Sequence, residues 1–168
     1  MKKNFLILAL AFVSTIIFAQ TESFDLLKYK VPSGWTSQSR LTQVSYVGTE
    51  PETNTPVEII VYKSQEAAPK IDSSFRQEWH RIFDASYGNP STPAVRKRNS
   101  SNSLQYAENG AELMHSGQKQ YSHLFVFSAN GKVQSIQINA SKLAAYKALR
   151  LFVDELLESV DTLVKQAE

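Results

Sequence analysis

The sequence of 168 residues contains no cysteine. Disulfides, thiolate metal ligands and a lipid-modified cysteine are therefore excluded, and the fold depends on its core alone. The six glycines stand singly, so there is no glycine-rich phosphate-binding loop, and no serine lies in a G-x-S-x-G pattern. The sequence therefore predicts a protein that is not an enzyme, with no catalytic, cofactor-binding or metal-binding residues.

The first 19 residues have the composition of a secretory signal peptide. Lys2 and Lys3 precede a mainly apolar run at 5–18, and small Ala19 follows that run. The alternative is a membrane anchor, but the run is shorter than the ~20 apolar residues that span a bilayer. We expect cleavage after Ala19, a single mature domain at 20–168 without a membrane anchor, and a periplasmic or secreted location.

The charges balance once residues 1–19 are set aside. The whole chain carries 18 basic and 16 acidic residues, and Lys2 and Lys3 are the only charged residues before position 20. The mature chain therefore has 16 residues of each sign. A balanced surface gives no electrostatic reason to expect nucleic acid or an anionic membrane as a partner.

Alternating apolar residues predict that the domain opens with a strand at 26–31. A turn through Pro32 and Gly34 closes this strand, and Trp35 follows at once. We expect the Trp35 ring to fill one end of the core. Pro32, Gly34 and Trp35 are therefore interpreted as structural markers and not as a recognition motif.

Two further strands and a helix are predicted next. Residues 41–47 alternate in polarity, and 57–63 (VEIIVYK) has apolar residues on both faces, which is typical of an interior strand. Apolar residues at 71–87 recur at helical spacing, with Trp79 in the stripe that faces the core. Asp72 and the two serines after it are candidate caps, and Gly-Asn-Pro ends the helix.

The second half of the sequence predicts a meander of antiparallel strands joined by two turns, S-G-Q-K at 116–119 and N-G at 130–131. Strands are also expected near 94–98 and 104–115. If both turns are tight, the apolar residues of the meander are divided between the two faces of the sheet. One face carries Met114, Tyr121, His123, Phe125, Phe127, Ile136 and Ile138, and the other carries Leu113, Leu124, Val126 and Val133.

Both faces of this sheet need a cover. The helix at 71–87 supplies one cover, and the last segment supplies a second, because apolar residues recur at helical spacing from Tyr146 to Val160 after a possible cap at Ser141. The predicted fold class is α+β, an antiparallel β-sheet sandwiched by helices.

The order of these elements resembles a known group of proteins. The chain has Y-x-V-P-x-G-W at 29–35, a helix with Phe75 and Trp79, N-G-x-V-x-S-I at 130–136 and L-E-S-V at 157–160. It is similar in these motifs to uncharacterised secreted or periplasmic proteins of Gram-negative bacteria with a PsbP-like fold. The resemblance implies an αβα sandwich. Proteins of this fold act as photosystem accessory subunits, envelope factors or chaperones, and none of their sites is carried over here.

One acid–base pair can be built from the predicted strands. If the turn uses all of 116–119, Glu112 lies directly opposite His123. Such a pair is a common contact between strands, and a base also needs a nucleophile and a pocket. Glu112 and His123 are therefore the one candidate pair, and they are interpreted first as structural.

Three functions remain open from the sequence. The first is a non-enzymatic secreted or periplasmic binding or accessory domain that engages a protein or a small apolar ligand through a groove or sheet face. The second is an envelope hydrolase or metal-dependent enzyme that uses the neighbourhood of Glu112 and His123. The third is a chaperone-like binder of exported polypeptides, which requires an exposed apolar groove.

Overall fold

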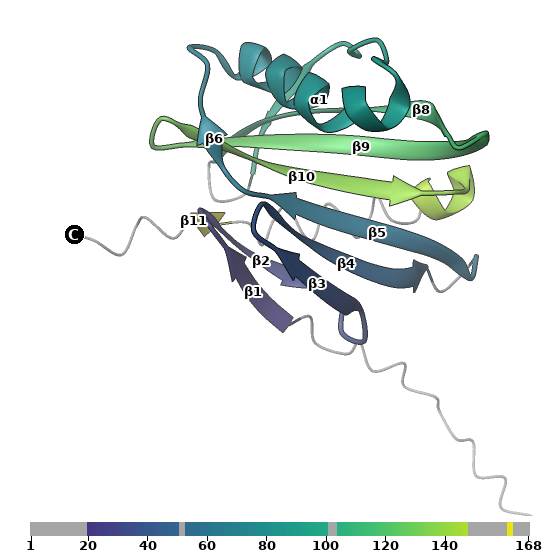
Figure 1. The fold of residues 1–168 in the computed structure, drawn as a ribbon. Coiled ribbons are helices and arrows are strands. Elements are labelled where there is room, and N and C mark those ends of the chain that lie inside the picture. Colours follow the sequence, from purple (N-terminus) through teal and green to yellow (C-terminus); the bar gives the residue numbers. More distant parts are fainter. Residues whose placement is uncertain (1–19, 51–52, 101–103, 148–160, 163–168) are drawn as a thin grey trace, which may run out of the picture.

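The computed structural model describes residues 20–50, 53–100, 104–147 and 161–162. Within them, a large antiparallel sheet is crossed on one side by a long helix, and a small sheet lies beside it (Figure 1). The large sheet consists of β3 (Thr36–Arg40), β4 (Gln43–Glu50), β5 (Thr55–Tyr62), β6 (Gln65–Glu66), β7 (Arg96–Asn99), β8 (Gln105–His115), β9 (Gln118–Ala129) and β10 (Lys132–Ala140). The small sheet consists of β1 (Gln20–Phe24), β2 (Leu27–Val31) and β11 (Asp161–Thr162).

The strand order of the large sheet is β3-β4-β5-β10-β9-β8-β7, and β6 also pairs with β10. After β5 the chain passes through the helix α1 (Ile71–Tyr87) to the far edge of the sheet, and it returns as a meander that ends beside β5. The prediction that 57–63 is an interior strand is confirmed, because β5 lies between β4 and β10 and Val57, Ile59, Ile60 and Val61 are all buried. Strands β1 and β3 were not predicted from the sequence, because they are rich in polar residues.

The turn between β8 and β9 is shorter than predicted, and this changes the register. His115 pairs with Gln118, so the turn has only two central residues, Ser116 (φ 49°) and Gly117 (φ 78°). Two consecutive left-handed residues are typical of a type I′ turn, which matches the twist of a hairpin. The strands are therefore shifted by two residues from the predicted register. Because the shift is even, every side chain keeps its predicted face.

Helix α1 has the predicted bounds and the predicted buried stripe. Trp79 and Phe75 are fully enclosed, and Gly88 ends the helix in the left-handed conformation with φ 70°. The predicted cap at Asp72 or the serines is wrong, because the N-cap residue is Lys70 and its side chain makes no capping hydrogen bond. No helix in the described ranges combines the length and apolarity of a membrane span.

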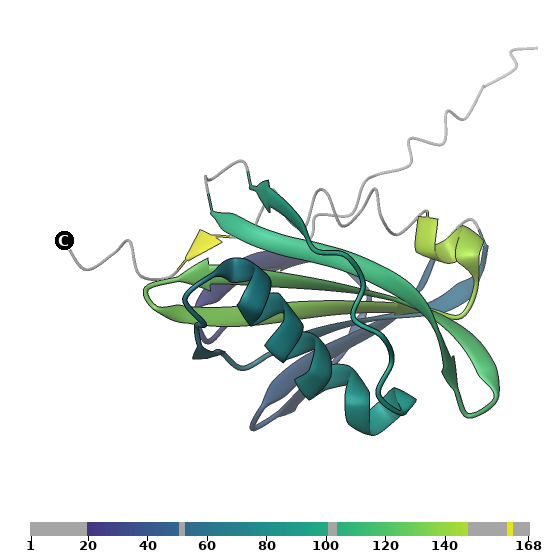
Figure 2. The ribbon, with the colours of Figure 1, turned by 90° about the horizontal axis from the view of Figure 1, so that it is seen from above.

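The helix covers one face of the sheet over β8 and β9, as Figure 2 shows from above. The core on this side combines the α1 stripe with residues from the far half of the sheet: Ile71, Phe75, Trp79, Ile82, Phe83, Ala107, Leu113, Leu124, Val126 and Val133. The predicted division of apolar residues between the faces is confirmed on both sides.

The opposite face is covered by the small sheet, and this cover was not predicted. Leu27, Tyr29 and Val31 of β2 pack into a core with β4, β5, β9 and β10, together with Ala145 from a helical segment at 143–147. The Gln134 amide of β10 accepts from Leu26 N at 2.9 Å and donates to the carbonyl of Phe24 at 2.8 Å, so it fastens the β1–β2 turn to the large sheet. Most of the predicted terminal helix, 148–160, lies outside the described residues.

Trp35 is half-buried and packs against this second core. It follows Gly34, which has φ 79°, a conformation that favours glycine. The indole ring lies directly over Gly48 of β4: a Cβ atom there would be 2.3 Å from Trp35 Cε2. The Pro-x-Gly-Trp stretch thus closes β2 against the core, in agreement with its structural interpretation.

The packing of Trp35 on Gly48 can be tested by filling the space between them. Gly48→Ala should lower the free energy of unfolding by about 1–3 kcal/mol, because the added methyl group overlaps the indole ring. Urea denaturation measures this change. In a Trp35→Ala background, Gly48→Ala should lower the free energy of unfolding much less. An equal loss of stability in both backgrounds would show that the ring does not lie over Gly48.

Candidate functional site

The predicted partners Glu112 and His123 do not face each other directly. With the two-residue turn, Glu112 pairs with Tyr121, and its Oε1 lies 2.7 Å from Lys119 Nζ at the exposed end of the hairpin. The backbone partner of His123 is Gly110. The register prediction was wrong because a four-residue turn was assumed where left-handed residues permit two. Ser116 and Lys119 have S-x-x-K spacing, but both are exposed at this hairpin turn and Lys119 is already ion-paired.

His123 instead joins two other side chains. Its Nε2 lies 2.9 Å from Glu108 Oε2, and its Nδ1 lies 2.6 Å from the Tyr146 hydroxyl. His123 is 5% exposed and Glu108 is 4% exposed. A neutral imidazole that donates to Glu108 has its other nitrogen free to accept the tyrosine proton. The three groups therefore form a continuous hydrogen-bonded line across the sheet.

This line is held by close packing. The imidazole of His123 stacks on Phe125 with ring centroids 4.5 Å apart, and a Cβ atom at Gly110 would lie 2.9 Å from both His123 Nδ1 and the Tyr146 hydroxyl. Arg98 completes the cluster, with its Nε 2.7 Å from Glu108 Oε1. The arrangement attaches the segment at 143–147 to the sheet.

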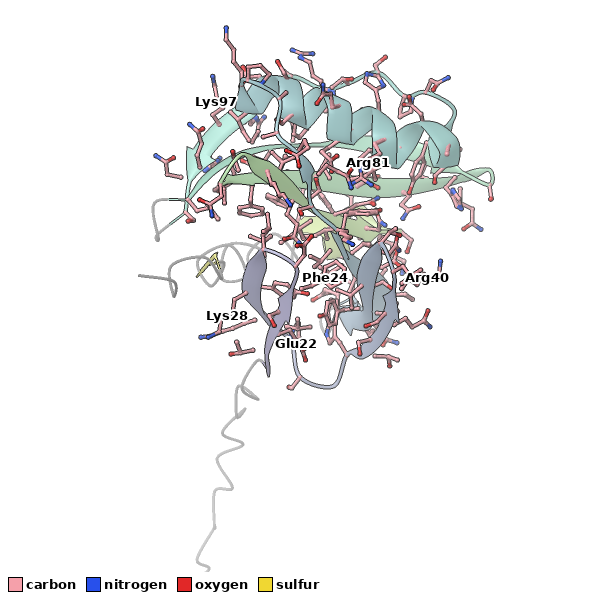
Figure 3. The ribbon with its side chains drawn as sticks, turned by 60° about the vertical axis from the view of Figure 1, so that its left-hand side comes forward. Glu22, Phe24, Lys28, Arg40, Arg81 and Lys97 are labelled. Atoms are coloured by element: carbon pink, nitrogen blue, oxygen red, sulfur yellow. The ribbon has the colours of Figure 1, made fainter. Side chains whose placement is uncertain are left out.

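A second polar cluster lies on the helix side of the sheet. Glu78 of α1 is 3% exposed. Its carboxylate accepts two bonds from Arg81, at 2.8 and 2.6 Å, and one from Ser135 Oγ of β10 at 2.5 Å. The Arg81 guanidinium carbon lies 5.2 Å from the centre of the Tyr62 ring on β5, a cation–π distance. Arg81 thus lies between α1 and the sheet, as Figure 3 shows.

The surroundings of Tyr62 and Arg81 keep each of these two side chains in one protonation state. Burial raises the pKa of Tyr62, although the nearby Arg81 charge acts in the opposite direction. Burial also disfavours the charged form of Arg81, but its hydrogen bonds to Glu78 outweigh that effect and raise its pKa. Tyr62 therefore remains a neutral hydroxyl donor, and Arg81 remains a cation.

The polar network continues from Tyr62 across the sheet. The Tyr62 hydroxyl donates to Gln137 Oε1 at 2.5 Å, and Gln137 Nε2 donates to Asn139 Oδ1 at 2.8 Å. Asn139 Oδ1 also accepts from Ser122 Oγ at 2.7 Å, while its Nδ2 donates to Glu58 Oε2 at 3.1 Å. These hydrogen bonds connect β5, β9 and β10, and the contact of Arg81 with the Tyr62 ring links them to the Glu78 cluster on α1.

We call the helix-side positions on β3, β4 and β5 the open face, because the helix contacts of the described chain fall mainly on β8 and β9. These positions share one side of the sheet by their cross-strand register. They include Gln38, Arg40, Gln43, Ser45, Val47, Glu58, Ile60 and Tyr62. Ser45 and Ile60 among them are buried, whereas Gln38, Arg40 and Val47 are exposed. Arg81 borders this face at one end.

A hollow of about 430 Å³ lies at the other end of the open face. Its walls come from the β4–β5 hairpin, through Val47, Pro56 and Glu58, and from the β8–β9 hairpin, through Gln118 and Gln120. No group of three or more acidic or histidine side chains suited to a metal ion occurs among the described residues. The exposed lining of the hollow is more apolar than polar, and hydrogen-bonding side chains such as Glu58, Gln120 and Asn139 lie within it.

Some of these site residues could have been found from the sequence, and others could not. With a two-residue turn the register places Gly110 opposite His123, and Glu108 and Glu112 are both diagonal neighbours on the same face, so the register alone does not select Glu108. Polar residues alternate in S-I-Q-I-N at 135–139, and this alternation indicates one polar face of β10. Nothing in the local sequence indicates that Glu78 and Arg81 would meet that face, because they reach it only through the packing of α1.

The structural role of Glu108 can be separated from that of Glu112. Glu108→Ala should lower the free energy of unfolding by about 3–5 kcal/mol, because it leaves buried partners without their carboxylate. Glu112→Ala, at the exposed hairpin end, should leave the unfolding midpoint in urea nearly unchanged. A double-mutant cycle with His123→Ala should give a coupling energy for Glu108 and none for Glu112. The reverse result would restore the register predicted from sequence.

Comparison with known proteins gives structural matches only. No protein-family model matches the chain, and no curated protein sequence matches it. The chain is similar to the solution structure of cyanobacterial PsbP from Synechocystis, with TM-score 0.58, 12% identity and coverage of 89% of this chain and 95% of that one. It is also similar to the Ran-binding protein Mog1p of Saccharomyces cerevisiae, with TM-score 0.60, 12% identity and coverage of 86% and 96%.

A third similar structure is LpqN of Mycobacterium tuberculosis, a protein involved in cell envelope biogenesis. Its TM-score is 0.56 at 12% identity, and the match covers 81% of this chain and 82% of LpqN. At this level of identity the likeness concerns the fold and not the activity. Taken together, these likenesses show that the chain has a PsbP-like fold.

Proposed function

We propose that this chain is a non-catalytic binding or accessory domain that engages a protein partner through the open face. The observation that carries the proposal is the set of polar side chains along that face, which runs from Glu78 and Arg81 through the Arg81–Tyr62 contact and the hydrogen bonds of Gln137 and Asn139 to Glu58. The network holds the surface side chains in place before a partner arrives. Binding then orders few additional side chains, which reduces its entropic cost.

Arg81 and Tyr62 form the most suitable anchor on this surface. The guanidinium donates two hydrogen bonds to the Glu78 carboxylate and lies over the tyrosine ring. Its side chain is still 36% exposed, so it can reach a partner. Arginine and tyrosine are enriched among the residues that contribute most to protein interfaces.

The charge of the open face favours a partner that presents carboxylates. Arg40 pairs with Gln43, which in turn pairs with Tyr62, so Arg40 and Arg81 share one side of the sheet. Figure 3 shows Arg40 at the edge of the sheet, on β3. Two cations at one end of a hydrogen-bonding surface suit an acidic, polar protein surface.

The structural relatives agree with a binding role. Mog1p is a Ran-binding protein, and LpqN is involved in cell envelope biogenesis. A chaperone for apolar segments would instead need a contiguous apolar groove. In the described part of the chain, the exposed large apolar side chains stand on separate elements: Leu41, Val47, Met114 and Leu143. These observations favour a polar partner over an apolar segment.

Site-specific photocrosslinking tests the open face. We expect p-benzoylphenylalanine at Gln38, which is exposed on the open face, to give a discrete crosslinked partner in the native host. The same group at Gln77, exposed on α1, serves as the control position and should give none. The crosslinked protein is then purified and its affinity for the uncrosslinked domain is measured.

Charge reversal on the open face should weaken this complex. Arg40→Glu should raise the Kd at least about tenfold, because it places like charge against a carboxylate-bearing partner. Arg76→Glu, an exposed charge reversal on α1, is the matched control and should leave the Kd unchanged. Equal crosslinking at both positions, or equal effects of the two reversals, would contradict the proposal.

We further propose that the domain acts outside the cytoplasm after removal of residues 1–19. Two observations support this location. The sequence opens with a basic and apolar leader, and β1 begins at Gln20, directly after the expected cleavage site. The absence of cysteine removes any dependence on disulfide formation there.

Expression of the full chain in a Gram-negative host tests the location. The protein released from the envelope should have the intact mass of residues 20–168, since the signal peptidase would cut after Ala19. Ala19→Arg should block this processing, because the enzyme requires a small residue at that position. A full-length protein that stays in the cytoplasm would contradict the proposal.

A further inference from the structure

The hollow at the far end of the open face shares Val47, Glu58 and Asn139 with that face and its polar network, but the protein-binding proposal does not use its β8–β9 wall. It lies between two hairpins, β4–β5 and β8–β9, with Asn139 and Ala140 of β10 also in its lining. Its volume of about 430 Å³ falls in the range of roughly 300–1,000 Å³ that small-molecule sites occupy. Arg81 and Arg40 do not line it.

Two polar side chains in the hollow are held in fixed orientations by residues behind them. Gln120 Oε1 accepts the Tyr87 hydroxyl proton at 3.1 Å, which leaves the Gln120 amino group to donate elsewhere. Asn139 Nδ2 donates to Glu58 Oε2, and no described residue donates to Glu58 Oε1. Asn139 is itself 5% exposed and fixed by Ser122 and Gln137. The hollow therefore presents an oriented donor and an oriented acceptor.

This pair of groups selects the chemistry of a ligand. A carboxylate accepts from one hydroxyl, while an amide amino group donates to the oxygen of a neighbouring hydroxyl. Two adjacent hydroxyls on a ring satisfy both at once, and each hydroxyl can donate and accept. Gln118 and Ser141 add further neutral hydrogen-bonding groups at the rim.

The charges of the hollow argue against an anion. Glu58 is the acidic residue of the lining, and the one lysine, Lys119, is ion-paired to Glu112 at 2.7 Å. Tyr87 flanks the site from the end of α1, where its ring lies 5.4 Å from that of His115. A neutral sugar has hydroxyls along its edge and C–H groups on its ring faces, so it matches a lining that combines apolar wall with one carboxylate and several amides better than a charged ligand does.

We infer that the hollow between the β4–β5 and β8–β9 hairpins is a binding site for a neutral saccharide, with Glu58 and Gln120 as its recognition residues. One sugar ring places vicinal hydroxyls between the two side chains. The site is separate from the Arg81 end of the open face and shares Glu58 with it, so Gln120→Ala and Arg40→Glu distinguish the saccharide from the protein partner.

Titration of the mature domain with defined oligosaccharides tests the inference. The probes are maltohexaose, cellohexaose, chitohexaose and mannohexaose, each followed by calorimetry and by amide chemical shifts. At least one probe should bind, and the shifts should concentrate in β5, β9 and the end of β10. Glu58→Gln and Gln120→Ala should each weaken that binding about tenfold or more, because each loses a hydrogen bond at the ligand.

Glu112→Gln is the matched control, because it changes an exposed carboxylate on the same hairpin outside the hollow. It should leave saccharide affinity unchanged, and so should Arg40→Glu, which tests the protein-binding face instead. The inference is overturned if none of the four probes binds at up to about 10 mM. It is also overturned if Glu58→Gln leaves binding intact, or if the polyamine spermidine binds at Glu58 while the saccharides do not.

Discussion

Strand β10 is buried on both faces, and its polar side chains connect most of the structure. Ile136 and Ile138 fill the core under the small sheet, while Ser135, Gln137 and Asn139 point to the helix side. A buried polar group left without a partner costs about 1–3 kcal/mol, so each of these side chains requires a specific neighbour. Those requirements determine how the other elements meet the sheet.

The polar residues of β10 join it to three other elements of the helix side, α1, β5 and β9. Ser135 bonds Glu78 of α1, Gln137 bonds Tyr62 of β5, and Asn139 bonds Ser122 of β9 and Glu58 of β5. Gln134, on the opposite face, holds the turn between β1 and β2. The network gives a rigid support on which an exposed Arg81 at one end and a ligand-sized hollow at the other can be positioned.

Patterns within short stretches of sequence predicted the helix, strand and turn whose formation depends on neighbouring residues. The stripe of α1, the two-sided strand at 57–63 and the Asn130-Gly131 turn were each visible, because helical spacing, alternation and left-handed residues act over a few neighbours. The β8–β9 register was missed for an equally local reason, since Ser116 takes a left-handed conformation more typical of glycine or asparagine. That one turn removed the direct pairing of His123 with Glu112, and side-chain packing then joined His123 to Glu108 and Glu112 to Lys119.

The sequence by itself determined helix α1, the strands with a clear apolar pattern and the face on which each side chain of the meander lies, because helical spacing and strand alternation depend only on neighbours along the chain. Only the tertiary structure decided which polar groups meet. Glu78 and Ser135, or Glu58 and Asn139, are far apart in sequence, and their pairing depends on the long crossover from β5 through α1 to the far edge. The open face and its hollow exist because α1 packs over β8 and β9 and leaves the β3–β5 half to the surface.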